Sequence, residues 1–136
     1  MNRIKIIFPA IILLFLAYYN YGYSQTNNLK WRFDKVGYDE FGQPTTNLYL
    51  VINEKEYFIE KQDLEFNEEI TSSDNNQLIE GQPVILYCFG FWAGYEKAYY
   101  VIKNIKNNSY SIYYNESTDA DEDSEIGPIL FLKDIE

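Results

Sequence analysis

The acidic segment near the end of the chain is the first place where the residue types could do chemistry. Asp119, Asp121 and Asp123 have the spacing of the first, third and fifth positions of a calcium-binding loop. The pattern then fails, because Ser124 stands where that loop needs glycine and Leu130 stands where it needs a bidentate glutamate. We interpret the segment as a solvated charged loop and keep a calcium-stabilised structural domain as an alternative function.

Aromatic side chains form the second candidate site. The chain has 14 tyrosines, nine phenylalanines and two tryptophans, and flat rings with polar tips suit sugars, peptides and protein interfaces. The rings that we expect to bind a ligand lie in adjacent hairpins: Trp92, Tyr95, Tyr99 and Tyr113. For any single ring we favour packing within the sheet, since tyrosine and phenylalanine are ordinary strand residues.

Composition excludes several classes of enzyme. The chain has no histidine and a single cysteine, so Ser-His-Asp triads, Cys-His dyads, histidine metal sites and intrachain disulfides cannot form. That cysteine, Cys88, stands among apolar strand residues and is expected to be buried and unreactive. A small hydrolase would need only two carboxylates, and Glu96 does lie beside tyrosines. Most acids stand in polar loops where nothing would raise a pKa, so we expect no enzymatic activity.

The elements that must position these residues are strands. Helical periodicity is nearly absent, while short apolar or alternating runs recur between turn residues. The sequence therefore predicts an all-β fold, a single antiparallel domain of about seven strands arranged as a sandwich, an open meander or a small barrel. We expect this domain to span residues 25–136, with an ordered core at about 29–135. The expected strands are residues 29–34, 47–52, 56–60, 84–92, 98–103, 110–114 and 129–132.

The strand at 84–92 is apolar on both faces, which is unusual for an antiparallel sheet with one side in water. Alternation places Val84, Leu86 and Cys88 on one face, and the neighbouring strand at 98–103 is similar. Something must cover the second face: the polar connection at 62–81, a second chain or a ligand. For that connection we expect an exposed segment with one short helical turn around Leu64–Glu69.

The first 24 residues resemble a secretory signal peptide. Arg3 and Lys5 precede an apolar run of twelve residues, Ile6–Ala17, which is too short to cross a bilayer as a helix. Gly22 and Ser24 supply small residues for cleavage before Gln25, leaving residues 1–24 as the signal peptide. No cysteine follows the run, so we expect an exported protein, periplasmic or extracellular, that is not a lipoprotein. An uncleaved segment acting as a membrane anchor is the alternative.

Two short motifs carry a resemblance to a known group of proteins. The turn Phe91-Trp92-Ala93-Gly94 leads into the strand Tyr99-Tyr100-Val101-Ile102, and residues 48–59 read as a hairpin with an Ile-Asn turn. This pattern resembles small exported β-rich bacterial proteins of uncharacterised function, over roughly residues 47–125. The resemblance implies an exported β-domain and assigns no activity to any residue.

The functional expectation combines these observations. The formal net charge is −10, so we expect no nucleic acid partner, because the phosphate backbone would be repelled. We expect an exported, non-enzymatic interaction module that binds a protein or a glycan through an aromatic sheet face and uses no cofactor. A homo-oligomer is left open. The alternatives are the calcium-stabilised structural domain and, less favoured, a small carboxylate-based hydrolase.

Overall fold

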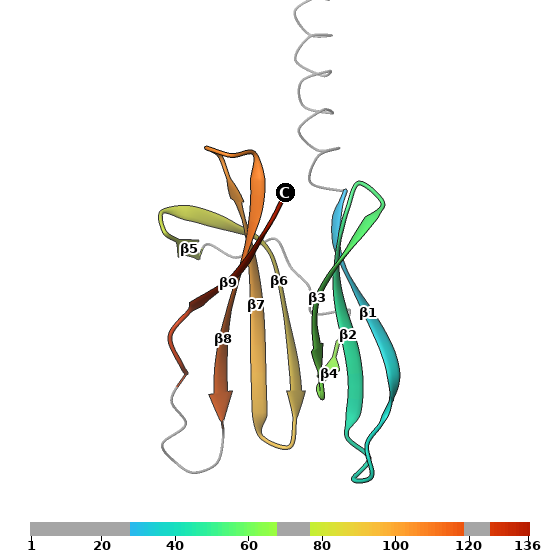
Figure 1. Cartoon of the computed structure of the whole chain (residues 1–136). Helices are drawn as coiled ribbons and strands as arrows, with labels where there is room; N and C mark the ends of the chain where they lie inside the picture. Colours follow the sequence, from blue (N-terminus) through green and yellow to red (C-terminus); the bar gives the residue numbers. More distant parts are fainter. Residues whose placement is uncertain (1–27, 68–76, 119–125) are drawn as a thin grey trace, which may run out of the picture.

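A computed structural model of the chain describes residues 28–67, 77–118 and 126–136 (Figure 1). Within these ranges the chain forms nine strands and no helix, and every strand pairing is antiparallel. The predicted all-β antiparallel fold is therefore confirmed. The described residues contain no helix that is long and apolar enough to span a membrane. The signal peptide expected at residues 1–24 lies outside the described residues.

The first sheet is a three-stranded meander whose strands are paired in sequence order. Its members are β1 (Leu29–Tyr38), β2 (Pro44–Ile52) and β3 (Lys55–Gln62). In the β1–β2 turn the Asp39 carboxylate accepts hydrogen bonds from the backbone N–H groups of Phe41 and Gln43, at 2.9 and 2.8 Å. In the β2–β3 turn Asn53 and Glu54 both have positive φ, 50° and 68°. Two successive residues of this kind give a turn that matches the twist of a hairpin.

The second sheet is larger and has the order β4-β6-β7-β8-β9, with β5 paired to β6 as well. Its members are β4 (Glu65–Phe66), β5 (Leu78–Ile79), β6 (Gln82–Trp92), β7 (Tyr95–Asn104), β8 (Ser109–Thr118) and β9 (Leu130–Ile135). The β6–β7 turn again has two residues with positive φ, Ala93 at 49° and Gly94 at 84°. The seven predicted strands all form, and β4 and β5 add two short ones.

A β-bulge interrupts the pairing of β2 with β3. Leu48 lies opposite Glu60 and Tyr49 lies opposite Phe58, so Ile59 is an extra residue in β3 without a partner in the register. An extra residue changes which side chains point to which face of a strand. As a result Ile59 is buried in the core and Glu60, opposite the buried Leu48, also points into the space between the sheets.

The two sheets face each other across one hydrophobic core (Figure 1). Two facing sheets correspond to the sandwich among the three predicted arrangements. The core contains Trp31, Leu48, Leu50 and Ile59 from the first sheet, and Leu86, Cys88, Tyr99, Val101, Ile112 and Ile135 from the second. Cys88 is buried as predicted, and burial raises the pKa of its thiol, which disfavours the reactive thiolate.

Side-chain contacts join the sheets along their edges. Lys133 of β9 extends its ammonium group to β3 and donates hydrogen bonds to the carbonyl oxygens of Phe58 and Ile59, at 3.0 and 3.5 Å. On the other side the rings of Phe33 in β1 and Phe66 in β4 stack with centroids 5.0 Å apart. The short strand β4 therefore connects the second sheet to the first.

The outer face of the second sheet carries a second apolar cluster. It consists of Ile79, Val84, Tyr100, Ile102 and Tyr113. The connection at 62–81 contributes Ile79 through β5, so part of the second apolar face is covered by the chain itself. The predicted placement of Val84 is wrong, because the register shifts between Val84 and Leu86. Val84 therefore joins the outer cluster while Leu86 joins the core between the sheets.

The helical turn predicted around Leu64–Glu69 does not form over residues 64–67. Glu65 and Phe66 pair with Phe91 and Gly90 of β6, and Leu64 is buried. The apolar residues at positions 64 and 66 have the period of a strand, and pairing with β6 satisfies the backbone that a single helical turn would leave unpaired. The remainder of the predicted turn, residues 68 and 69, lies outside the described residues.

The close approach of β4 to β6 gives a first testable prediction, at Gly90. A Cβ atom added at Gly90 would lie 2.8 Å from Cζ of Phe66 and 3.0 Å from Cβ of Leu64. Because Phe66 is held by its stacked partner, the Gly90→Ala substitution should lower the free energy of unfolding by about 1–3 kcal/mol, as overpacking does. Urea unfolding followed by circular dichroism measures this change.

Gly37→Ala is the matched control for Gly90. Gly37 also lies in a strand, and nothing stands within 4 Å of its added Cβ. Its substitution should change the free energy of unfolding by less than about 0.5 kcal/mol. Equal effects of the two substitutions would contradict the tight packing of β4 on β6.

Candidate functional site

The four aromatic residues predicted to bind a ligand do not share one open face. Trp92 and Tyr95 are partly exposed and lie opposite each other beside the β6–β7 turn. Tyr99 is fully buried in the core between the sheets, and Tyr113 belongs to the outer cluster with 8% of its surface exposed. Tyr99 and Tyr113 therefore lie on opposite faces of the second sheet, and neither offers a ring face to a ligand.

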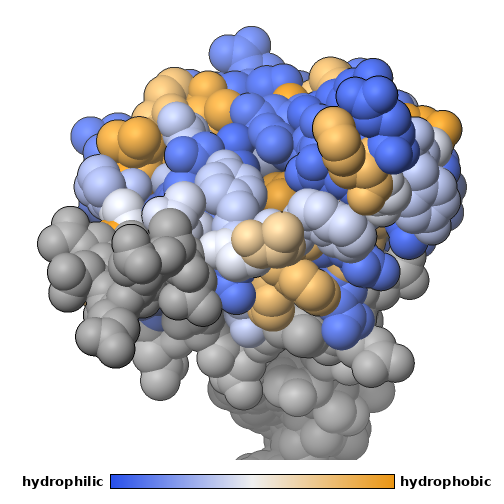
Figure 2. Space-filling model, turned by 90° about the horizontal axis from the view of Figure 1, so that it is seen from below, coloured by the Kyte–Doolittle hydropathy of each residue, from blue (hydrophilic) through white to orange (hydrophobic). Residues whose placement is uncertain are grey.

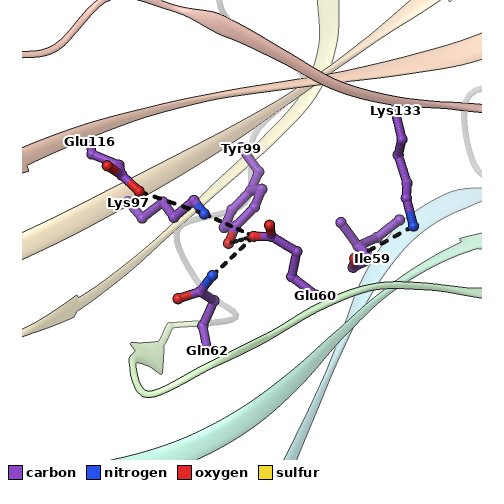
Figure 3. Close-up of polar contacts among 7 residues, drawn as sticks. All are labelled: Ile59, Glu60, Gln62, Lys97, Tyr99, Glu116 and Lys133. Carbon is purple, nitrogen blue, oxygen red and sulfur yellow. Dashed lines mark hydrogen bonds and ion pairs between the residues drawn. The ribbon is translucent and has the colours of Figure 1, made fainter.

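A group of charged and polar side chains, in which Lys97 is buried and Glu116 is half exposed, lies where Tyr99 faces the first sheet (Figure 3). Oε2 of Glu60 accepts three hydrogen bonds, from the hydroxyl of Tyr99 at 2.6 Å, Nζ of Lys97 at 2.9 Å and Nε2 of Gln62 at 3.0 Å. Lys97 is also 3.7 Å from Oε1 of Glu116. We call Glu60, Gln62, Lys97, Tyr99 and Glu116 the inner polar cluster. It joins β3 of one sheet to β7 and β8 of the other.

The inner polar cluster supplies interaction partners for the ammonium group of Lys97, which has almost no contact with water. Lys97 is only 5% exposed, and its ammonium group lies 4.5 Å from the ring centre of Tyr114 and 5.3 Å from that of Tyr99. A buried ammonium group requires a counter-charge and electron-rich neighbours to replace its hydration. Glu60 supplies the counter-charge, and the rings of Tyr99 and Tyr114 are the electron-rich neighbours.

The electrostatics of the cluster favour an ionised carboxylate and neutral phenols. Burial raises the pKa of Glu60, but hydrogen bonds from Tyr99, Lys97 and Gln62 together with the charge of Lys97 outweigh burial, so the pKa is lowered. Burial and the hydrogen bond to Glu60 raise the pKa of Tyr99, and burial together with Glu116 raises that of Tyr95. A carboxyl group with a lowered pKa is a poor general acid. The chemistry of this cluster is that of a structural ion pair.

Sequence reasoning missed the inner polar cluster for a definite reason. The inward orientation of Lys97 can be predicted, since alternation from Tyr99 and Val101 places this lysine on the same face as two core residues. The inward orientation of Glu60 cannot be predicted in this way, because alternation from Tyr57 and Ile59 would place its carboxylate on the opposite face. Only the bulge at Ile59 turns it inward.

A hollow lies on the outer face of the second sheet, on β6, β7 and β8. The register places Phe89 opposite Ala98 and Ala98 opposite Asn115, while the adjoining positions carry Tyr100 and Glu96. Because Ala98 is small and its neighbours are large, a space of about 130 Å³ remains above it. We call this space the outer hollow; it is lined by Phe89, Glu96, Ala98, Tyr100, Asn115, Glu116, Ser117 and Ile126.

Exposed apolar side chains border the outer hollow. Phe91 is 40% exposed and its ring lies 6.3 Å from that of Phe89, and Ile126 is 76% exposed. We call Phe89, Phe91, Tyr100 and Ile126 the outer patch; Tyr100 is only 9% exposed, so the exposed apolar surface of the patch comes from the other three residues. The view from the end that carries the β6–β7 turn shows separate groups of hydrophobic residues among hydrophilic ones (Figure 2). On the same face, nearer β5, Ile79 packs on the sheet.

A larger hollow of about 310 Å³ lies at the opposite end of the sandwich. It is bordered by the β2–β3 and β7–β8 turns and carries side chains of both charges, Lys103 and Glu136. Its mixture of charges does not select one kind of ligand.

The predicted calcium ligands Asp119, Asp121 and Asp123 lie outside the described residues. Among the residues that are described, no group of three or more histidine, cysteine, aspartate or glutamate side chains could hold a metal ion. The calcium-stabilised domain thus remains a prediction.

The inner polar cluster gives the second testable prediction, Lys97→Met. Methionine keeps the length and apolar stem of lysine but leaves Glu60 partly buried without its cation. The free energy of unfolding at neutral pH should fall by about 2–3 kcal/mol, less than the roughly 3–5 kcal/mol typical of breaking a fully buried ion pair, because Glu60 keeps some contact with water. Lys35→Met is the control, since Lys35 and Glu65 are half exposed and 3.8 Å apart. It should cost less than about 1 kcal/mol, and equal losses in urea unfolding would contradict the assignment.

The lowered pKa of Glu60 gives the third prediction, a loss of stability in acid. A carboxyl group with a lower pKa in the folded state contributes stability above its unfolded pKa of about 4.5, and this contribution disappears as the pH falls through the folded value. The Glu60→Gln variant lacks this contribution. Its free energy of unfolding should therefore fall less steeply than that of the wild type as the pH is lowered from 5 to 2.5. Parallel profiles for the two proteins would show that the Glu60 contacts do not favour ionisation.

Comparison with models of protein families, with curated protein sequences and with solved structures finds no match to this chain. No activity, ligand or partner can therefore be transferred from a relative. The resemblance to exported β-rich bacterial proteins stays a prediction from two short motifs. What the protein does has to be inferred from its own side chains, of which the inner polar cluster and the outer patch are the two unusual groups.

Proposed function

We propose that the protein is an exported, non-enzymatic binding module that contacts its ligand through the outer patch. The observation that carries the proposal is the uneven cover of the second sheet. Part of its outer face is covered by Ile79 of β5, whereas around the outer hollow Phe91 and Ile126 remain 40% and 76% exposed. Exposed apolar groups that gather beside a hollow mark binding surfaces more often than isolated exposed residues do.

The rigidity of the sheet supports a role in recognition. Phe89, Phe91 and Tyr100 of the outer patch lie on β6 and β7, two long strands inside the second sheet, and Ile126 forms an isolated bridge with Ser117 of β8. Tyr100 donates a hydrogen bond to Oδ1 of Asn115 at 3.0 Å. Side chains held in this way lose little conformational entropy when a ligand binds. The patch can therefore present aromatic contact area at low entropic cost.

The inner polar cluster supports a non-enzymatic role. Carboxylate catalysis at neutral pH needs one carboxyl group with a raised pKa and access for a substrate. Glu60 has a lowered pKa, and Tyr99 beside it is fully buried. Both residues take part in the contacts that hold the two sheets together.

Binding by the outer patch is tested with one substitution and its matched control. The wild type, Phe91→Thr and Phe58→Thr are applied to a peptide array and a glycan array. Phe58 is 51% exposed and lies on a strand of the first sheet, so both variants remove one exposed aromatic ring from a strand. We expect the wild type and Phe58→Thr to bind the same ligands, and Phe91→Thr to lose at least about five- to tenfold in affinity, as at the centre of an interface.

Two results would overturn the proposal. One is an absence of any ligand for the wild type on both arrays. The other is an equal effect of the two substitutions, which would place binding away from the outer patch. Circular dichroism and urea unfolding of both variants establish that a lost ligand does not reflect a lost fold.

A further inference from the structure

We infer that the outer hollow receives a lysine or arginine side chain from a basic segment of a protein partner. The inference rests on the proposed function, since it assumes that the outer patch is a binding surface, and it names the chemistry of the ligand. Three features of the hollow carry it: its size, its walls and the charge of Glu96.

The size of the hollow suits the end of one side chain. Its volume of about 130 Å³ equals the volume of roughly four water molecules in the liquid. Pockets that enclose a whole small molecule usually have about 300–1,000 Å³. A single ammonium or guanidinium group with its last methylene groups fits the hollow, and the remainder of the partner would lie over the surrounding surface.

The walls of the hollow favour a cation with an apolar stem. Phe89 and the mostly buried Tyr100 line it from two neighbouring strands, and aromatic rings attract cations electrostatically. Ile126 and Phe91 lie at its border with exposed apolar surface. Lysine and arginine bury their methylene groups against such surface while the charged end reaches a polar partner.

The charge of Glu96 completes the site. Glu96 lies between Phe91 of β6 and Ser117 of β8 in the register and lines the hollow. Among the described residues no lysine or arginine forms an ion pair with it, whereas Glu60 and Glu116 are both paired with Lys97. A carboxylate beside aromatic walls provides the counter-charge that an incoming cation needs. The net charge of −10 would attract a basic segment from a distance.

The test uses three labelled octapeptides in which leucine alternates with lysine, serine or glutamate. Binding to the purified full-length protein is measured by fluorescence anisotropy at 0.15 M salt, where long-range attraction is screened. Four proteins are compared: the wild type, Glu96→Gln, Ala98→Leu and Glu54→Gln. Glu54 is an exposed acid at the opposite end of the sandwich, so its variant removes the same charge far from the hollow. Ala98→Leu fills the hollow and leaves every charge in place.

We expect the wild type to bind the lysine peptide at least tenfold more tightly than the other two. Glu96→Gln and Ala98→Leu should each weaken that binding about five- to tenfold, while Glu54→Gln should change it less than twofold. The signals of the Ala98 and Ile126 methyl groups in NMR spectra should shift when the lysine peptide is added. If Ala98→Leu unfolds, the Glu96→Gln variant and the methyl signals still show whether the lysine peptide binds at the outer hollow.

Three outcomes would overturn the inference. The lysine peptide could bind all four proteins equally, which would indicate general attraction to an acidic protein. It could fail to bind the wild type. Finally, the serine or glutamate peptide could bind as tightly as the lysine peptide and be weakened by Ala98→Leu but not by Glu96→Gln. That last outcome would leave the outer patch as a binding surface and remove only its selectivity for a cation.

Discussion

The sandwich is organised around the burial of one ammonium group. Lys97 is 5% exposed, and a charge so far from water must be met by an opposite charge in fixed geometry. That charge is Glu60, which belongs to the other sheet and reaches Lys97 at 2.9 Å. The distance between the sheets, the inward turn of β3 and the position of the Tyr99 hydroxyl all have to agree with this contact. A shift of either sheet would separate Glu60 from Lys97 and leave the ammonium group with only its 3.7 Å contact to Glu116.

Local patterns in the sequence were sufficient to predict the strands, because alternation and turn residues act over a few positions. They failed where an extra residue enters a strand. The bulge at Ile59 moves Glu60 to the other face of β3, and the register shift after Val84 places Val84 on the other face of β6 from Leu86. Alternation of residue types alone does not reveal a bulge.

The site was harder to predict than the fold because it depends on register between strands. Trp92, Tyr95, Tyr99 and Tyr113 stand in adjacent predicted hairpins, yet two of them are buried on opposite faces. The outer hollow instead depends on Ala98, a residue with no chemistry of its own. Its importance appears only when Phe89 and Asn115 are known to flank it on neighbouring strands. The space that a small residue leaves can be recognised in the structure but not predicted from the sequence.

The hydrogen bonds from Lys133 to β3 have a consequence for how separate molecules meet. Exposed strand edges offer free carbonyl and amide groups to other chains and are common starting points for aggregation. Lys133 occupies the carbonyl oxygens of Phe58 and Ile59 at the edge of the first sheet, beside a bulge that already disturbs the regular spacing. An incoming strand would have to displace a charged side chain and match an irregular edge. The same lysine that joins β9 to β3 therefore protects a β-rich protein at high concentration from adding a second copy to its sheet.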